Sequence, residues 1–188
     1  MTIEVQQRYP RPADIRNDLY GHVYTDWQWV GNVRNAGPSV PSFAALNGTV
    51  IYCYQFANGN EVHCDDLQLP HDYAEGTDLI THIHFCATTA TRITGTWTLD
   101  VHGWVDNSST LGAVQTTTYG FDVNPPTAFA MITASFSSVL SGTSRKISSI
   151  IQARLSLALT SGANLALLGL DAHYQKDSMG SIQIVAKP

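Results

Sequence analysis

Hydrophobic and polar residues alternate along much of this chain with a period of two, which is the period of a β-strand with one buried face. The longest such segment is 94–105, where Trp97, Leu99 and Val101 alternate with polar or charged residues. A second segment, 79–87, places His82 and His84 on one face and Ile83 and Phe85 on the other. The same pattern predicts strands over 115–123, 129–139, 165–174 and 181–186.

The segment 146–159 is the one place where a helix competes with a strand. Ile147, Ile150, Ile151 and Leu155 fit the stripe of an amphipathic helix. As a strand, the odd-numbered positions from Ile151 to Leu159 share one apolar face, and Ile150 is the exception on the other face. We predict a strand, which brings the total to about eight to ten strands.

Residues 49–56 are β-branched and aromatic, and Asn58-Gly59-Asn60 follows them as a turn with easy access to positive φ. The segment 61–69 then returns. These features predict a β-hairpin in which 49–56 pairs with 61–69.

Composition agrees with β-structure. Charged residues make up only 13% of the 188 residues and hydrophobic residues 44%, whereas long helices usually carry many Lys, Glu and Arg residues. We expect an all-β protein, an antiparallel β-sandwich with a jelly-roll-like arrangement of strands. Residues 1–20 carry Pro10 and Pro12 and few large apolar residues, so they are expected to form an extended N-terminal arm, either a flexible tail or a strap on a neighbouring subunit. The domain is then 21–188.

The net charge of −5 argues against nucleic acid as a partner, because such proteins usually carry a basic surface. The sequence shows no signal-peptide pattern and no apolar stretch of about 20 residues, so we expect no membrane partner and synthesis in a cytoplasm. Cys53, Cys64 and Cys86 have no disulfide or metal-binding spacing and are expected to be free thiols.

The most specific candidate for chemistry is a metal site. His82 and His84 are two residues apart on one strand face, about 7 Å apart along the backbone. Asp171 and His173 could add ligands from a distant strand, and His71 and Asp72 lie in the loop that precedes the strand 79–87. A cupin-like metal enzyme remains an alternative, but the residues after His84 do not follow the cupin pattern. We expect hydrogen-bonded imidazoles and no metal-binding residue.

Other catalytic patterns are weaker. The chain has no Gly-x-Ser-x-Gly motif, and His63 and Cys64 are neighbours whose side chains should point to opposite faces. Asp65, Asp66, Glu75 and Asp78 are interpreted as solvated loop carboxylates. We therefore expect no enzyme, no catalytic residue and no cofactor. Abundant Trp and Tyr residues also permit a carbohydrate-binding module.

Two segments carry a resemblance. The first runs from Leu67 to Phe85 (LQLPHDYAEGTDLITHIHF), and the second from Leu168 to Ser181 (LGLDAHYQKDSMGS). Together with the strand 148–154 they resemble a group of virion structural proteins of tailed bacteriophages. This chain differs from that group at Phe85, where Trp is expected, and in a shortened loop at 160–164.

The resemblance implies a jelly-roll capsid decoration (cement) protein that binds and stabilises the assembled head shell. The implied partners are the major capsid protein and the chain itself, as a homotrimer, and the implied location is the capsid surface of the virion. The alternative is a phage tail, fibre or neck component with a glycan-binding β-sandwich module. In the first case the arm, residues 1–20, should make intersubunit or capsid contacts.

Overall fold

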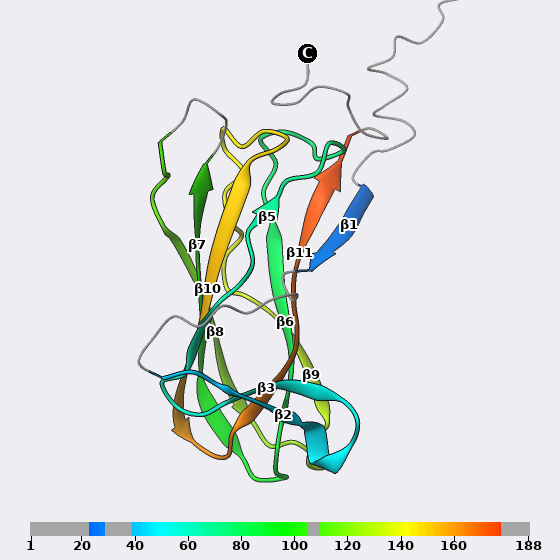
Figure 1. Ribbon diagram of the computed structural model, residues 1–188, viewed down its shortest axis with the longest axis vertical. Coiled ribbons are helices and arrows are strands. Elements are labelled where there is room, and N and C mark those ends of the chain that lie inside the picture. The colour runs from blue at the N-terminus through cyan, green and yellow to red at the C-terminus, as the bar shows by residue number, and fades with distance from the viewer. Residues whose placement is uncertain (1–22, 29–38, 105–109, 178–188) are drawn as a thin grey trace, which may run out of the picture.

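The protein is described by a computed structural model over residues 23–28, 39–104 and 110–177. In this part of the chain two antiparallel sheets pack face to face, as Figure 1 shows. One sheet has the order β2-β3-β11-β6-β9, with β1 also paired to β11; the other has the order β4-β10-β7-β8, with β5 also paired to β10. The strands are β1 (Val23–Gln28), β2 (Ser42–Ala45), β3 (Tyr52–Phe56), β4 (Glu61–His63), β5 (Leu67–Gln68), β6 (Ile80–Ala87), β7 (Ile93–Trp104), β8 (Gln115–Val123), β9 (Met131–Ser135), β10 (Ile150–Ser161) and β11 (Leu165–Lys176).

Eight of these strands have the connectivity of a jelly roll. The four-strand series β3-β11-β6-β9 faces the series β4-β10-β7-β8, and the chain passes from one sheet to the other at almost every connection. Among these eight, only β7 and β8 are consecutive in the chain and also paired with each other. The predicted all-β, jelly-roll-like sandwich is confirmed.

The predicted hairpin between 49–56 and 61–69 is wrong. The turn exists, with Gly59 at φ 78°, but β3 pairs with β2 and β11, whereas β4 pairs with β10 of the other sheet. The turn docks on β10, where the Gly59 amide donates to the Leu157 carbonyl. Phe56 and Val62 can therefore enter the core from opposite sheets.

The predicted faces of the long strands are confirmed. Trp97, Leu99 and Val101 of β7 are buried between the sheets. Of the segment 146–159, residues from Ile150 onward form the strand β10 and no residue is helical, while 146–149 precede the strand as a turn. The odd-numbered side chains from Ile151 to Leu157 are buried, Leu159 is half-buried and Ile150 is exposed. The only helical element in the described residues is a single 3-10 turn, η1 (Leu46–Gly48), so no helix there could span a membrane.

Other predictions from the sequence differ from the structure or concern residues that it does not describe. The predicted strand 129–139 is shorter, because β9 ends at Ser135. The arm, residues 1–20, and the strand predicted at 181–186 lie outside the described residues. The arm, its function and the domain boundary at residue 21 remain predictions.

Candidate functional site: a histidine–aspartate cluster

The outer face of the six-stranded sheet carries a cluster of ionisable side chains that comes from three strands. On β6, residues 81, 83 and 85 point into the core, so His82 and His84 point outward. On β11, Leu170 and Ala172 are core residues, so Asp171 and His173 also point outward. Antiparallel pairing places Asp171 opposite His82, and β1 places Asp26 opposite His173. We call these five residues, Asp26, His82, His84, Asp171 and His173, the histidine–aspartate cluster.

Asp171 is the centre of the cluster. Its Oδ2 lies 2.8 Å from His82 Nε2, and its Oδ1 lies 3.5 Å from His84 Nε2. The residue is only 5% exposed although it is on an outer sheet face. Oδ1 is buried and accepts no hydrogen bond from the described residues. A buried carboxylate oxygen without a hydrogen bond is costly, and such an atom calls for an explanation.

His84 is held in place from its other side. Its Nδ1 lies 2.9 Å from Thr133 Oγ1 on β9. Gly169 is the residue opposite His84 on β11, and even a Cβ at this position would lie 3.4 Å from the imidazole. The His84 ring therefore lies over this position of β11 at an ordinary van der Waals distance, with Nε2 directed toward Asp171.

The second histidine–carboxylate pair extends the cluster toward β1. His173 Nε2 lies 2.5 Å from Asp26 Oδ1. The His82 ring is the link, with its centroid 4.5 Å from that of His173 and 5.0 Å from that of His84. The cluster is thus continuous across β1, β11 and β6, and Thr133 of β9 borders it.

Burial sets the protonation of the central pair. It lowers the pKa of His82 below its ordinary value, and Asp171 opposes this shift only in part. Burial also raises the pKa of Asp171. The lowered pKa of His82 favours the neutral imidazole, which is the form that binds metal ions, whereas the raised pKa of Asp171 disfavours the carboxylate form.

Two sets of three residues have suitable ligand atoms within 4.8 Å of one another. They are His82, His84 and Asp171, and Asp26, Asp171 and His173. The structure thus brings together four of the residues singled out from the sequence, but it separates His71 and Asp72 from them. Asp72 instead binds the Tyr174 hydroxyl at 2.8 Å and Lys176 Nζ at 2.6 Å. The expectation that none of these residues binds a metal is not tested by this geometry.

Sequence reasoning missed Asp26 and Thr133. Neither belongs to a recognisable motif, and each joins the cluster only through strand register. Asp26 lies opposite His173 and Thr133 lies opposite His84. The register between strands brings these two residues to the cluster, and this register cannot be predicted from the local alternation of polar and apolar residues.

The remaining acidic residues have structural contacts. Glu75 Oε1 accepts a hydrogen bond of 3.0 Å from the Ile147 amide, and Asp78 Oδ1 accepts one of 2.9 Å from the Gly142 amide. Asp66 binds Gln152 at 2.8 Å. Asp66 and Asp78 are exposed and Glu75 is half-buried, and each also accepts a hydrogen bond that connects a loop to another part of the sandwich.

Cysteine chemistry is absent from the surface. His63 is exposed and Cys64 is buried, which confirms that these neighbours point to opposite faces. All three cysteines are free, as predicted, and all three are buried. Burial raises the pKa of Cys64 to about 12, so its thiolate is scarce at neutral pH.

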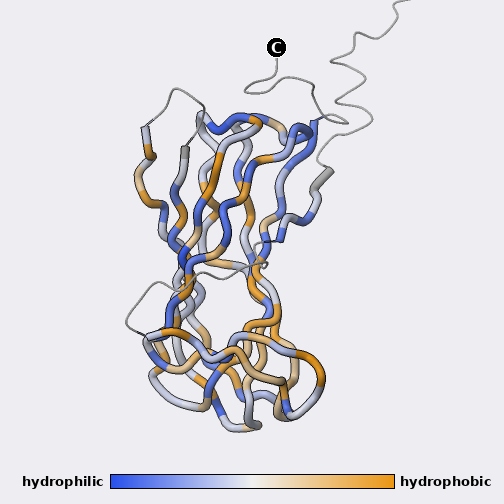
Figure 2. Tube along the Cα trace, in the orientation of Figure 1, coloured by the Kyte–Doolittle hydropathy of each residue, from blue (hydrophilic) through white to orange (hydrophobic). Residues whose placement is uncertain are grey.

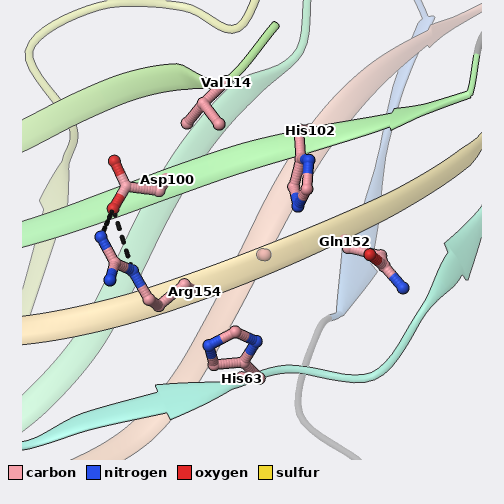
Figure 3. A pocket seen from close by; sticks show the side chains of 7 residues that line it. His63, Asp100, His102, Val114, Gln152 and Arg154 are labelled. Carbon is pink, nitrogen blue, oxygen red and sulfur yellow. Dashed lines mark hydrogen bonds and ion pairs between the residues drawn. The ribbon is translucent and has the colours of Figure 1, made fainter. Parts of the chain in front are cut away.

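The other sheet carries a shallow hollow of about 280 Å³ on its outer face. Figure 3 shows His63 and His102 on either side of it, with Arg154 bound to Asp100. Arg154 Nη2 lies 2.6 Å from Asp100 Oδ2, and Glu61 lies 3.4 Å from the same guanidinium. The arginine charge is therefore already balanced, so the hollow offers no free cation for an anionic ligand.

An apolar surface lies at the edge of the six-stranded sheet, on β2, β3 and the connection between η1 and β3. Its members are Phe43, Val50, Ile51 and Tyr52, which are 58–94% exposed. We call these four residues the apolar hairpin. Figure 2 colours the connection from η1 to β3 as hydrophobic. The Phe43 ring packs against the rings of Tyr52 and Tyr54, with centroids 5.7 and 4.9 Å apart.

Comparison with known proteins gives a weak structural likeness. No family model and no curated protein matches the chain. Two solved structures of infectious bursal disease virus, of the Gt and Gx strains, resemble it with TM-scores of 0.41 and 0.42 at 13% sequence identity. The matches cover 80% and 76% of this chain, which spans only 39% of the length of either viral chain. A likeness of this size adds nothing to the fold already described, and no family can be assigned from it.

Proposed function

We propose that this chain is a structural virion protein of a bacteriophage, a capsid decoration protein that binds the assembled head shell. The phage assignment comes from the sequence resemblance. In support of it, the two segments that carry the resemblance fold as one unit. His82 of the first segment contacts Asp171 of the second, and Asp72 of the first contacts Tyr174 and Lys176 of the second.

The apolar hairpin is the observation that carries the binding function. Along β3 the inner face of the sheet begins fully buried at Phe56, is half-buried at Tyr54 and is 58% exposed at Tyr52. The face that forms the core thus continues into solvent at this edge. Exposed apolar surface of this kind on a folded protein marks a site of protein contact. We assign the head shell as the partner that covers it.

The same surface argues against the glycan-binding alternative. A sugar site needs aromatic faces together with polar groups that bind hydroxyls. Beside Phe43 and Tyr52, however, the exposed large side chains are the aliphatic residues Val50, 94% exposed, and Ile51, although the small polar residues Asn47 and Thr49 are exposed as well. Aliphatic side chains favour contact with another protein surface.

A decoration protein gains its effect by mass action: it binds the assembled shell better than the free shell protein and so stabilises the shell. It performs no reaction, so we propose that the chain is not an enzyme. Shell sites on three-fold axes favour a homotrimer, and the arm, residues 1–20, is proposed to add intersubunit or capsid contacts.

A binding experiment tests this proposal. Heads from a phage that lacks this gene are mixed with the purified full chain and pelleted, and bound copies are counted. Wild-type chain should saturate the heads. The variant Val50→Ser/Ile51→Ser should bind at least about tenfold more weakly, because it replaces two apolar side chains of the contact surface with polar ones. A tenfold loss of affinity corresponds to about 1.4 kcal/mol of binding free energy. Leu111→Ser/Val114→Ser, which also changes two exposed apolar residues, is the matched control and should bind normally.

Three results would overturn the proposal. The first is a chain that never pellets with heads, and the second is equal binding by the two double variants. The third is binding to tails or to a glycan array with loss on replacement of Tyr52, which would favour the glycan-binding alternative.

A further inference from the structure

The buried oxygen of Asp171 without a hydrogen bond needs a partner, and the surrounding atoms indicate what that partner is. Asp171 is 5% exposed, and its Oδ1 accepts no hydrogen bond from the described residues. The nitrogen atoms that face the carboxylate are His82 Nε2, at 2.8 Å from Oδ2, and His84 Nε2, at 3.5 Å from Oδ1. A cation placed among these three groups would complete the coordination of the orphaned oxygen.

We propose that His82, His84 and Asp171 form a binding site for one divalent transition-metal ion of the zinc class. This proposal goes beyond the proposed function and does not depend on it. It also departs from the expectation drawn from the sequence alone. The orphaned oxygen and the convergence of three ligands on it are the new observations.

The separations suit such an ion. The three ligand atoms all lie within 4.8 Å of one another. Ligands of a tetrahedral zinc ion, at 2.0–2.1 Å from the metal, are about 3.3 Å apart. His82 Nε2 is 2.8 Å from Oδ2 and His84 Nε2 is 3.5 Å from Oδ1, so the two histidines approach different oxygens of the carboxylate. To bind one ion through a single oxygen, the side chains must rotate so that separations of at most 4.8 Å become about 3.3 Å.

The donor atoms select the type of metal. Two imidazole nitrogens and one carboxylate suit zinc, cobalt, nickel or copper, whereas magnesium and calcium prefer oxygen ligands alone. Three protein ligands leave a fourth position for water. The His84 side chain is 28% exposed and that of His82 12%, so an ion can reach the site from solvent.

The hydrogen-bond partners of the proposed ligands also support metal binding. Metal-binding histidines usually use the second ring nitrogen in a hydrogen bond that fixes the tautomer. Thr133 Oγ1 lies 2.9 Å from His84 Nδ1. With the proton on Nδ1 and donated to this hydroxyl, the lone pair of Nε2 faces Asp171. His173 is held by Asp26 at 2.5 Å and borders the site.

The test uses untagged full-length protein that has been stripped with EDTA, loaded with zinc chloride and desalted. Elemental mass spectrometry should find one zinc per chain. With zinc at about a hundred times its Kd, the melting temperature should rise by about 5–10 °C. Cobalt should give visible absorption bands of a four-coordinate ion.

Two double variants distinguish zinc bound at this site from zinc bound nonspecifically by other histidines of the chain. His82→Ala/His84→Ala should lose the zinc and the rise in melting temperature, whereas His63→Ala/His102→Ala, which alters the two histidines of the hollow on the other sheet, should keep both. Asp171→Asn preserves the shape of the side chain but removes its charge, and it should also lose zinc. It therefore tests the proposal even if the double histidine variant fails to fold. Zinc below about 0.1 per chain in the wild-type protein would overturn the proposal, as would undiminished binding by Asp171→Asn or loss of zinc in the control.

Discussion

The Asp72 carboxylate accepts a 2.8 Å hydrogen bond from the Tyr174 hydroxyl and lies 2.6 Å from Lys176 Nζ. It thereby joins the loop before β6 to the end of β11. The backbone continues this connection, because the Ala74 amide donates to the Gln175 carbonyl at 2.7 Å. The two segments that carry the phage resemblance are therefore connected at the loop as well as at the histidine–aspartate cluster.

Replacement of Asp72 should destabilise the fold. Asp72→Ala removes the acceptor for Tyr174 and the partner of Lys176, and hydrogen bonds to a charged group are worth about 1.5–3 kcal/mol. Urea denaturation should show a loss of this size in the free energy of unfolding. Asp65→Ala is the comparison, since Asp65 forms no hydrogen bond or ion pair with the residues that the structure describes, and it should change that free energy by less than about 0.5 kcal/mol. Equal losses in the two variants would show that Asp72 is not a structural connection.

The same carboxylate predicts a pH dependence. Burial alone would raise the pKa of Asp72, but its bonds with Lys176 and Tyr174 outweigh burial and lower the pKa. An unfolded Asp titrates near pH 4, so the stabilisation is fully present above that pH and is lost as the pH falls through the lower folded value. The difference in unfolding free energy between wild type and Asp72→Asn should be constant above about pH 5 and shrink in acid. A difference that grows on acidification would contradict this assignment.

The buried thiols should be inert in the native protein. Because burial raises the pKa of Cys64 to about 12, its thiolate fraction at pH 8 is roughly a thousandfold below that of an ordinary thiol. Burial also raises the pKa of Cys86. Iodoacetamide labelling followed by mass spectrometry should modify these two cysteines only after unfolding in urea. Rapid labelling of Cys64 in the folded chain would mean that the sheets open at this point.

Gly142 should not tolerate a side chain. A Cβ there would lie 1.7 Å from the Thr77 carbonyl oxygen, and the Gly142 amide is the donor to Asp78. Gly142→Ala must displace the backbone around it, so we expect the free energy of unfolding to fall by about 1–3 kcal/mol. Gly120→Ala on β8 has open space, with nothing within 4 Å of its Cβ, and should be nearly neutral. The midpoints of thermal unfolding of both variants check this contrast.

The strand faces were predictable from the sequence because alternation is a local property. The buried positions of β6, β7 and β10 follow directly from it, and it also separated His82 and His84 from the core. Sheet membership was not predictable, as the wrong hairpin shows: the turn at Gly59 is compatible both with a hairpin and with a crossing between sheets. What decides between them is the packing of Phe56 and Val62 in the common core, which depends on the whole fold.

The candidate site shows the same limit. His82, His84, Asp171 and His173 stood out as residue types, but their convergence depends on the register between β6 and β11. The burial of the Asp171 carboxylate on an outer face could not be read from alternation, which predicts only that it points away from the core. Its orphaned oxygen is visible only in three dimensions.

The most direct test of the proposed virion function is an electron cryo-microscopy reconstruction of the mature particle of the phage that we propose encodes this chain. We predict that the two-sheet density lies on the outer surface of the head, with β2 and β3 against the shell. A head whose surface lacks this density, or a particle in which the chain is found only in the tail, would contradict the decoration function.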